Sequence, residues 1–249
     1  MKKRIDLLLV EQKLVPSREK AQALILAGKV LVNEERVEKA GKLVQASSKL
    51  RIIEKDHPYV SRGGVKLEAA LWELEFSPEA LVALDVGAST GGFTHCLLLH
   101  GAEHIFAVDV GYGQLAWELR QHPQVTSLER TNIRNLAFEQ IGTFVDLVVI
   151  DVSFISLKLI FPEVLRFLKS EGHIIALVKP QFEASKADVG KRGRVSKADV
   201  HQRVQEDIIA VAQTQGLKVL QWIESSIPGK KSGNKEFFVF LQRKDRFIL

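Results

Sequence analysis

The most informative segment of this 249-residue chain reads Leu81-Val-Ala-Leu-Asp85-Val-Gly87-Ala-Ser-Thr-Gly91-Gly92-Phe93. Its first five residues form an apolar run that ends in an acid, which predicts a buried strand. A glycine-rich turn follows, and a helix is predicted over 94–100, ended by Gly101. Strand, tight turn and helix in this order are typical of an α/β sheet whose ligands lie at the carboxyl ends of the strands.

Outward from this segment, apolar runs of strand length alternate with helical periodicity. Further strands are predicted at 105–109, 125–128, 145–151, 173–178, 218–222 and 237–241. Further helices are predicted at 65–74, 161–168 and 200–215. This alternation predicts a parallel sheet with helices on both faces. The fold class is therefore α/β, a Rossmann-like sheet of seven strands preceded by a small α+β domain.

The first quarter of the chain differs from the rest in charge. Residues 1–66 carry fifteen Lys and Arg against eight Asp and Glu, whereas the remainder carries twenty against twenty-two. A basic module next to a near-neutral body indicates polyanion binding, with a solvated lysine-rich surface as the alternative. We expect a first domain at 1–58, a linker at 59–64 and a second domain at 65–249.

Three motifs in the basic module resemble the alpha-L RNA-binding motif of a small-subunit ribosomal protein and of pseudouridine synthases. They are Arg4-Ile-Asp6, Ser17-Arg18-Glu-Lys20-Ala21 and Gly28-Lys29-Val-Leu-Val-Asn33. Asp6 and Ser17 are also placed to cap the two helices expected there. The resemblance implies RNA contacts from one group of residues: Arg4, Ser17, Arg18, Lys20, Lys29 and Arg62. The alternative is that Arg18 and Lys20 are ordinary charges on a helix surface.

The glycine spacing distinguishes between two classes of cofactor. A dinucleotide fingerprint needs a glycine two residues after the first one, whereas position 89 is a serine. The turn instead resembles the first motif of S-adenosylmethionine-dependent methyltransferases. Asp109 ends the second strand, where the resemblance implies an acid that holds ribose hydroxyls; the alternative is a plain strand-end acid. The implied cofactor contacts are Asp85, Gly87, Ala88, Ser89, Thr90, Gly91, Gly92, Phe93, Asp109 and Asp151.

Four dispersed residues resemble the catalytic tetrad of FtsJ-type ribose 2′-O-methyltransferases. They are Lys66, Asp151, Lys179 and Glu236. Together with the basic module, they resemble the TlyA (haemolysin A) family of ribosomal-RNA methyltransferases. The resemblance implies 2′-O-methylation of a ribose, with cytidine as the nucleoside and Lys179 as the base. The implied partner is ribosomal RNA or a ribosomal subunit.

The residue types fit this chemistry. A ribose hydroxyl is a poor nucleophile, while a sulfonium methyl donor is already activated, so no metal is expected. A lysine acts as a base only when its pKa lies well below the free value of about 10.4, which a second cation and a dry crevice favour. Two lysines beside Asp151 would leave one of them without a full counter-charge. The alternative is two structural ion pairs, Lys66 with Glu236 and Asp151 with Lys179.

Other features restrict the class of protein. The apolar runs are far shorter than the roughly 20 residues of a spanning helix, so we expect no membrane association. A lone cysteine, Cys96, excludes an internal disulfide and a cysteine zinc site. We expect a cytoplasmic monomer. A cytolysin and a non-catalytic RNA-binding protein are the alternative functions. Basic segments at 186–197 and 229–233 are predicted to contact RNA, or else to be solvated loops.

Overall fold

A computed structural model describes residues 2–52, 57–229 and 233–244. The chain divides into two compact units, Met1–Pro58 and Tyr59–Leu249. Residues 59–64, expected as a linker, lie in the second unit, because Tyr59 is buried in its core and Ser61 caps its first helix. Lys230 and Lys231, in the second predicted RNA-contacting segment, lie outside the described residues.

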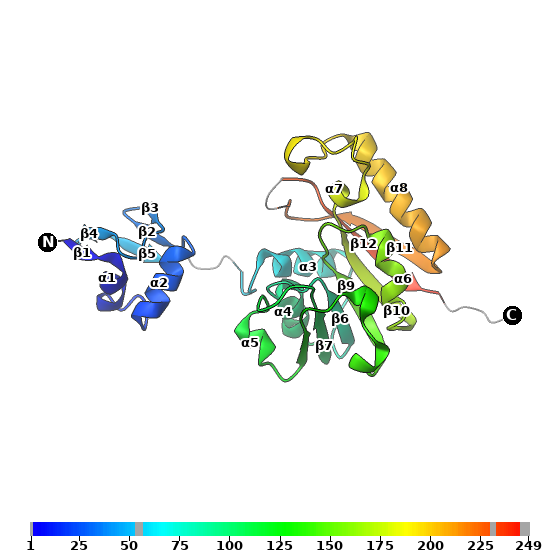
Figure 1. Cartoon of the computed structure of the whole chain (residues 1–249), viewed down its shortest axis with the longest axis horizontal. Helices are drawn as coiled ribbons and strands as arrows, with labels where there is room; N and C mark the ends of the chain where they lie inside the picture. Colours follow the sequence, from blue (N-terminus) through cyan, green and yellow to red (C-terminus); the bar gives the residue numbers. More distant parts are fainter. Residues whose placement is uncertain (1, 53–56, 230–232, 245–249) are drawn as a thin grey trace. The chain divides into compact units, whose positions relative to one another are not determined.

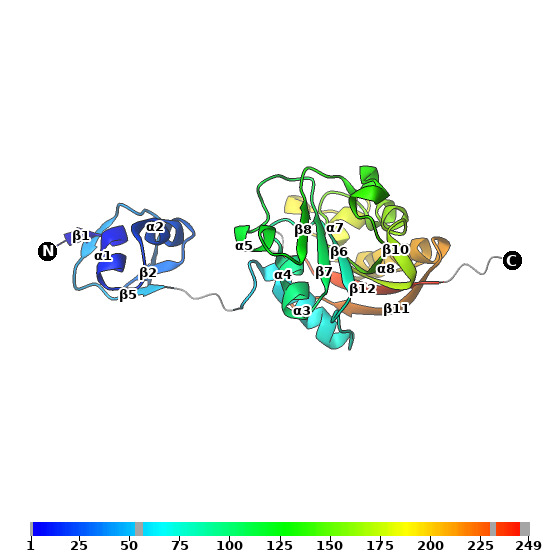
Figure 2. The same ribbon diagram turned by 90° about the horizontal axis from the view of Figure 1, so that it is seen from below.

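The first unit packs two helices against short antiparallel strands (Figures 1 and 2). Its elements are β1 (Lys2–Arg4), α1 (Ile5–Glu11), α2 (Arg18–Leu26), β2 (Val30–Val32), β3 (Glu35–Val37), β4 (Leu43–Gln45) and β5 (Leu50–Ile52). Ser17 caps α2 as predicted, since its hydroxyl accepts from Lys20 N at 3.2 Å. The cap predicted at Asp6 is wrong: α1 already begins at Ile5, and the buried Asp6 carboxylate accepts from arginines.

The second unit contains a seven-stranded sheet with the order β11-β12-β10-β9-β6-β7-β8. Its strands are β6 (Val82–Val86), β7 (His104–Val108), β8 (Val125–Leu128), β9 (Val145–Ile150), β10 (Leu168–Val178), β11 (Leu217–Glu224) and β12 (Phe237–Arg243). Its helices are α3 (Arg62–Glu73), α4 (Gly92–Leu99), α5 (Trp117–Arg120), α6 (Phe161–Val164), α7 (Pro180–Glu183) and α8 (Ala198–Thr214). Short 3-10 turns are η1 (Ile133–Asn135), η2 (Phe138–Gln140), η3 (Leu157–Leu159) and η4 (Lys191–Gly193).

The seven predicted strands are confirmed, but the sheet is mixed. β12 runs antiparallel to both β10 and β11, while β10, β9, β6, β7 and β8 are parallel. No helix intervenes between β11 and β12 in the described residues, so the chain returns beside β11 in the opposite direction. The helix predicted at 161–168 is shorter, because β10 already begins at Leu168.

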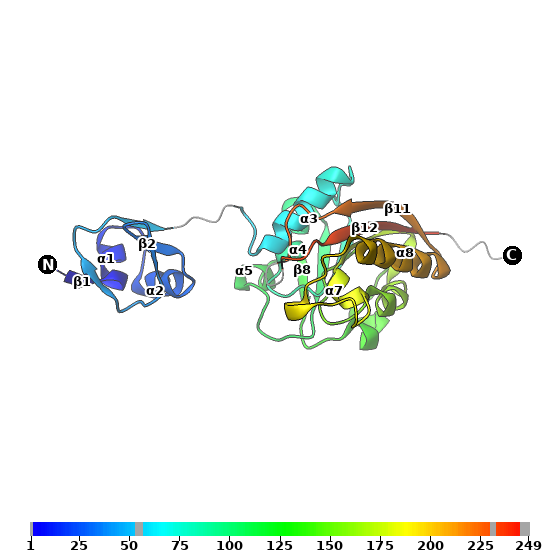
Figure 3. The ribbon, with the colours of Figure 1, turned by 90° about the horizontal axis from the view of Figure 1, so that it is seen from above.

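Helices cover both faces of this sheet, as predicted (Figure 3). One core cluster joins the sheet to α6 and α8, and the other joins it to α3, α4 and α5. Alternate residues of a strand serve the two clusters; on β9, Val148 faces one and Val149 the other. Strand order reverses between β6 and β9, so a crevice is expected at their carboxyl ends, where Gly87 and Asp151 follow.

Candidate active site

Gly87 forms the corner after β6. Its φ is +88°, and a Cβ there would stand 2.5 Å from the carbonyl oxygen of Asp151. Both Gly87 N and Ala88 N donate to Val108 O at the end of β7. Only a glycine combines this backbone conformation with so close an approach. The turn is therefore fixed against the ends of β7 and β9.

Asp85 lies buried beneath this turn. Thr94 Oγ1 donates to its Oδ2 at 2.6 Å, while Oδ1 has no hydrogen-bond partner among the described residues. Burial raises the pKa of this carboxyl to about 7; the Thr94 hydrogen bond opposes the rise, and the charges of Asp151 and Asp109 add to it. The turn thus contains one buried acceptor that a ligand or its water could satisfy.

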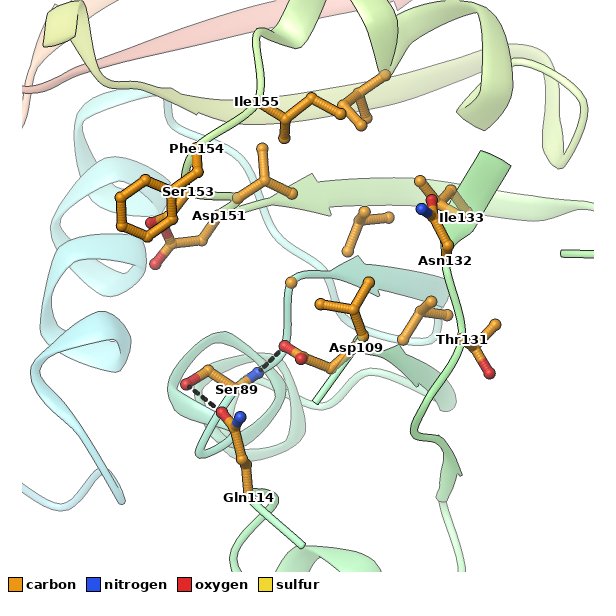
Figure 4. Close-up of a pocket in the computed structure, with 16 residues that line it drawn as sticks. Ser89, Asp109, Gln114, Thr131, Asn132, Ile133, Asp151, Ser153, Phe154 and Ile155 are labelled. Carbon is orange, nitrogen blue, oxygen red and sulfur yellow. Dashed lines mark hydrogen bonds between the residues drawn. The ribbon is translucent and has the colours of Figure 1, made fainter. Parts of the chain in front are cut away.

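Asp109 links the turn to β7. Its Oδ2 accepts from Ser89 N and its Oδ1 from Gly111 N, each at 2.7 Å (Figure 4). Each oxygen keeps a second lone pair, because a carboxylate offers about four acceptor sites. The carboxylate therefore orders two loops and can still accept hydrogen bonds from a ligand.

A cavity of about 480 Å³ opens beside Asp109, at the carboxyl ends of β6, β7 and β9 (Figure 4). This volume lies within the range of about 300–1,000 Å³ that is usual for small-molecule sites. Of the ten residues predicted to bind a cofactor, four line it: Gly87, Ser89, Asp109 and Asp151. The other lining residues are Val86, Val108, Val110, Gln114, Thr131, Asn132, Ile133, Val152, Ser153, Phe154, Ile155 and Ile160.

The other predicted cofactor residues do not line the cavity: Asp85, Ala88, Thr90, Gly91, Gly92 and Phe93. Gly91 and Gly92 have a packing role, since a Cβ on Gly92 would collide with Ser61 Oγ and one on Gly91 with Leu119. Their lack of side chains lets α4 approach α3 and α5.

Three polar residues that line the cavity were not predicted from the sequence: Gln114, Thr131 and Asn132. Thr131 and Asn132 follow β8. Because ligands bind at the carboxyl ends of parallel strands, their position after this strand could have predicted them.

Two ion pairs contain the four predicted catalytic residues. Lys179 Nζ lies 2.5 Å from Asp151 Oδ1 and also donates to Val152 O at 2.9 Å and Ser153 Oγ at 3.1 Å. Lys66, on α3, pairs with Glu236, and both side chains are largely buried. Each lysine thus has its own carboxylate. The expectation that one would lack a counter-charge is wrong for this structure, because the buried Glu236 neutralises Lys66.

The sheet brings the two pairs together. The last β10–β12 pair matches Val178 with Phe237 in antiparallel register. Lys179 and Glu236 are the next residues outward on the two chains, so they occupy facing positions at the same edge. Asp151 follows β9, the other neighbour of β10. The four residues, up to 170 positions apart, therefore lie at the same edge of the sheet, where Asp151 lines the cavity.

In the first unit, two of the predicted RNA-binding residues, Arg4 and Arg18, contact one buried carboxylate. Asp6 accepts from Arg4 at 2.9 and 3.0 Å, from Arg18 at 3.0 Å and from Gln22 at 3.0 Å. These donors hold the pKa of Asp6 well below its usual range. The two arginine side chains remain about half exposed, so their outer N–H groups can still contact a ligand.

The remaining predicted RNA-binding residues differ in exposure. Lys20 and Arg62 are exposed and Lys29 is half-buried. Arg62, in the second unit, donates to Pro228 O at 3.3 Å.

Within the described residues, no cluster of three His, Cys, Asp or Glu side chains could hold a metal ion. None of the described helices is long and apolar enough to cross a bilayer.

Residues 59–243 match the FtsJ-like methyltransferase model, and residues 3–50 match the S4 domain. The chain belongs to the FtsJ-like methyltransferase family. The Bacillus subtilis protein YqxC, described as a candidate rRNA methyltransferase, is 44% identical over 241 residues, covering 96% of this chain and 85% of that one. TlyA of Mycobacterium tuberculosis, a 16S/23S rRNA (cytidine-2′-O)-methyltransferase, is 42% identical over 240 residues, covering 96% and 89%.

A solved structure supports the same assignment to the FtsJ-like family. A Streptococcus thermophilus protein described as a candidate hemolysin shares 40% identity and superposes with a TM-score of 0.76, over 98% of this chain and 89% of that one. The family resemblance predicted from the glycine turn, the tetrad and the basic module is confirmed. The roles of individual site residues stay predictions.

Proposed function

We propose that this protein transfers a methyl group from S-adenosylmethionine to the 2′-oxygen of a cytidine ribose in ribosomal RNA. Its family supports methyl transfer, and the name of its Mycobacterium tuberculosis relative supports the nucleoside and the RNA. The observation that carries the proposal is the position of Asp151, which both lines the cavity and pairs with Lys179. A group in the cavity would lie beside the charges needed to activate a hydroxyl.

The cavity has the chemistry to hold this cofactor. Its apolar wall, including Val110, Ile133 and Ile155, suits a purine ring, and Asp109 offers lone pairs to ribose hydroxyls. The unpartnered Asp85 Oδ1 leaves an acceptor under the turn, which a bridging water could connect to a ligand in the cavity. When bound, the cofactor supplies a methyl group already activated by sulfonium. The residues around it then need only bind, orient and move one proton.

We assign to Lys179 the role of the base that accepts the proton of the ribose 2′-hydroxyl. The ion pair with Asp151 and two hydrogen bonds hold Nζ at the cavity rim, and one partner, Ser153 Oγ, can donate as well as accept. Nζ accepts the hydroxyl proton only as the neutral amine, so it first loses one proton to solvent. Ser153 Oγ can then rotate away and leave the Nζ lone pair open to the attacking hydroxyl. Asp151 orients Nζ and balances its charge. The Lys66–Glu236 pair would complete the group of charges at this edge of the sheet, because Glu236 lies opposite Lys179 in the register of β10 and β12.

The first unit supplies RNA affinity in this proposal. Arg4, Ser17, Arg18, Lys20 and Lys29 contact RNA there, and Arg62 contacts it in the second unit. Deleting residues 1–55 should leave cofactor binding intact and weaken the salt dependence of RNA binding, because phosphate contacts release counterions. A monomer acting on ribosomal RNA or ribosomal subunits in the cytoplasm is consistent with this function.

One experiment tests the proposed reaction. The purified protein is incubated with labelled S-adenosylmethionine and ribosomal RNA that lacks its modifications, and the methylated positions are mapped. We expect label on a ribose 2′-oxygen of cytidine and none with the Lys179→Ala variant. Label on a base, or cofactor-independent RNA binding alone, would refute the assignment. Lysis of erythrocytes by wild type and Lys179→Ala alike, without methylation, would favour the cytolysin alternative.

A further inference from the structure

The segment between α7 and α8, residues 184–197, carries an unusual set of charges. We call it the basic loop. Its five cations are all exposed: Lys186, Lys191, Arg192, Arg194 and Lys197. Its one acid, Asp188, pairs with Arg203 of α8 at 3.0 Å. Among the described residues, none of the five cations forms an ion pair, so the loop presents a net positive charge to solvent.

The loop is nevertheless ordered by a buried side chain. Asn234 Oδ1 accepts from Val195 N at 3.0 Å, and Asn234 Nδ2 donates to Gly193 O at 2.8 Å. Gly190 N also donates to Arg194 O at 2.8 Å, which closes a tight turn around Lys191 and Arg192. Asn234 and Val195 are only 2% and 3% exposed. The backbone that carries the cations is thus fixed before any ligand binds.

Both ends of this arrangement adjoin the tetrad. The basic loop begins just after α7, which follows Lys179 directly. Asn234 lies two residues before Glu236 on the segment that leads into β12. The loop and that segment are neighbours at one end of the unit, as Figure 1 shows. Cations held here lie close to the place where the target nucleotide would react.

We propose that the basic loop binds the phosphate backbone of RNA next to the target nucleotide, and that Asn234 holds the loop in its binding conformation. The proposal rests on the function proposed above and names the surface by which the methyltransferase domain holds its substrate. Unpaired cations attract phosphates without breaking existing ion pairs. A loop that is already ordered loses less conformational entropy on binding. RNA is the polyanion that the adjacent tetrad requires.

The test compares two charge reversals of equal size. The Lys191→Glu/Arg192→Glu variant alters the tip of the loop. The control, Lys218→Glu/Lys244→Glu, makes the same change in charge at the opposite end of β11 and β12, since Lys218 pairs with Gln242 far from Glu236. Both pairs of residues are exposed, so both variants should fold, which thermal unfolding checks. The measured quantities are KM and kcat for RNA, their salt dependence, and the Kd for S-adenosylmethionine.

The loop variant should raise KM for RNA about 10-fold at moderate salt, with kcat and cofactor Kd within about 2-fold of wild type. Losing two phosphate contacts should also lower the slope of log affinity against log salt by about 1.4–1.8. The control should change neither. Equal KM values and slopes for the two variants would overturn the proposal, and so would a fall in kcat alone. If the wild type methylates no RNA, the proposed function fails, and direct RNA binding still tests the loop.

A second variant isolates Asn234, because Asn234→Ala keeps every cation of the basic loop and removes the two hydrogen bonds that order it. We expect KM for RNA to rise several-fold while the salt slope stays at the wild-type value. The cofactor Kd should be unchanged, since Asn234 does not line the cavity. An unchanged KM would refute the role given to Asn234. A lowered salt slope would show that Asn234 affects the number of phosphate contacts, and would refute the claim that it only orders the loop.

Discussion

Gly87 and the carbonyl of Asp151 approach so closely that no side chain fits between the turn after β6 and the end of β9. The segment predicted to bind the cofactor and the segment that carries Asp151, a predicted catalytic residue, are therefore in direct backbone contact. A displacement of the turn after β6 would therefore also displace the residues that follow β9.

Gly87→Ala should both destabilise the protein and abolish methyl transfer. The added Cβ meets backbone, and alanine is strained at φ +88°. The control is Gly216→Ala, since Gly216 has φ +77° and a Cβ added there would have no neighbouring atom within 4 Å, so only the backbone strain of about 1 kcal/mol applies. Urea unfolding and a methylation assay measure the two effects. A Gly87→Ala protein as stable and active as the control would contradict the close packing described here.

Asp85→Asn should remove part of the pH dependence of stability. The native carboxyl has a pKa of about 7 against 3.8 for the unfolded group, so the native state binds a proton that the unfolded state has lost. Stability from this group is therefore complete below about pH 4 and falls as pH rises to about 7, by up to roughly 4 kcal/mol. An asparagine side chain cannot ionise, so the variant should gain stability relative to wild type between about pH 5 and pH 8.

Denaturant unfolding at several pH values measures this difference. Asp207→Asn is the control, because Asp207 is an exposed carboxylate that pairs with Lys158. Its stability relative to wild type should stay nearly constant over the same range. Parallel pH profiles for Asp85→Asn and wild type would show that Asp85 is ionised in the folded protein.

Lys179→Ala and Asp151→Ala should lose methyl transfer while retaining the fold, and Lys179→Arg should be inactive too. Arginine keeps the charge but cannot give up its proton in a protein. The control is Lys158→Arg, a lysine that also pairs with an aspartate but lies outside the cavity; it should keep its rate within about 2-fold. Single-turnover rates measure the step. If the Lys179→Arg enzyme kept a large fraction of the wild-type rate, Lys179 could not be the base, and its role would be electrostatic.

Asp6→Asn should destabilise the first unit by about 2 kcal/mol or more, because the buried carboxylate accepts three charged hydrogen bonds from Arg4 and Arg18. Its lowered pKa also means that this stabilisation is present above the usual aspartate range and is lost as pH falls below it. Glu11→Gln, which breaks the exposed pair with Lys3, should cost about 1 kcal/mol at most. Hydrogen exchange of α1 and α2 amides compares the two; equal protection would refute the central role of Asp6.

Sequence patterns predicted the strands, the glycine turn and the four tetrad positions, because each depends on local periodicity or on a short motif. The observed pairing, Lys66 with Glu236 and Asp151 with Lys179, was predicted only as the alternative to a lysine without a counter-charge, and the sequence could not decide between the two. The register of β10 and β12 places Glu236 opposite Lys179. The Glu236 side chain nevertheless pairs with Lys66 on α3. No local signal at Glu236 contains this information.

The same limit applies to Asp6 and to the cavity. Aspartate before an apolar run favours a cap, but three donors from α2 and β1 draw the carboxylate inward instead. Gln114 reaches the cavity from a loop without a motif, so only the folded chain identifies it. Gly91 and Gly92 match a cofactor motif, and the structure shows that they also allow close helix packing, which the motif alone did not indicate.

The position of β12 has a consequence for the protein during its own synthesis. β12 is inserted between β10 and β11, and among the described residues β11 pairs with no other strand. A ribosome that has translated the chain only to residue 230 has already produced the cavity-lining residues, but it has not yet produced Asn234, Glu236 or the strand that seats them. Every residue that lines the cavity is thus synthesised before Glu236, the last of the four predicted catalytic residues, and before the strand that follows it.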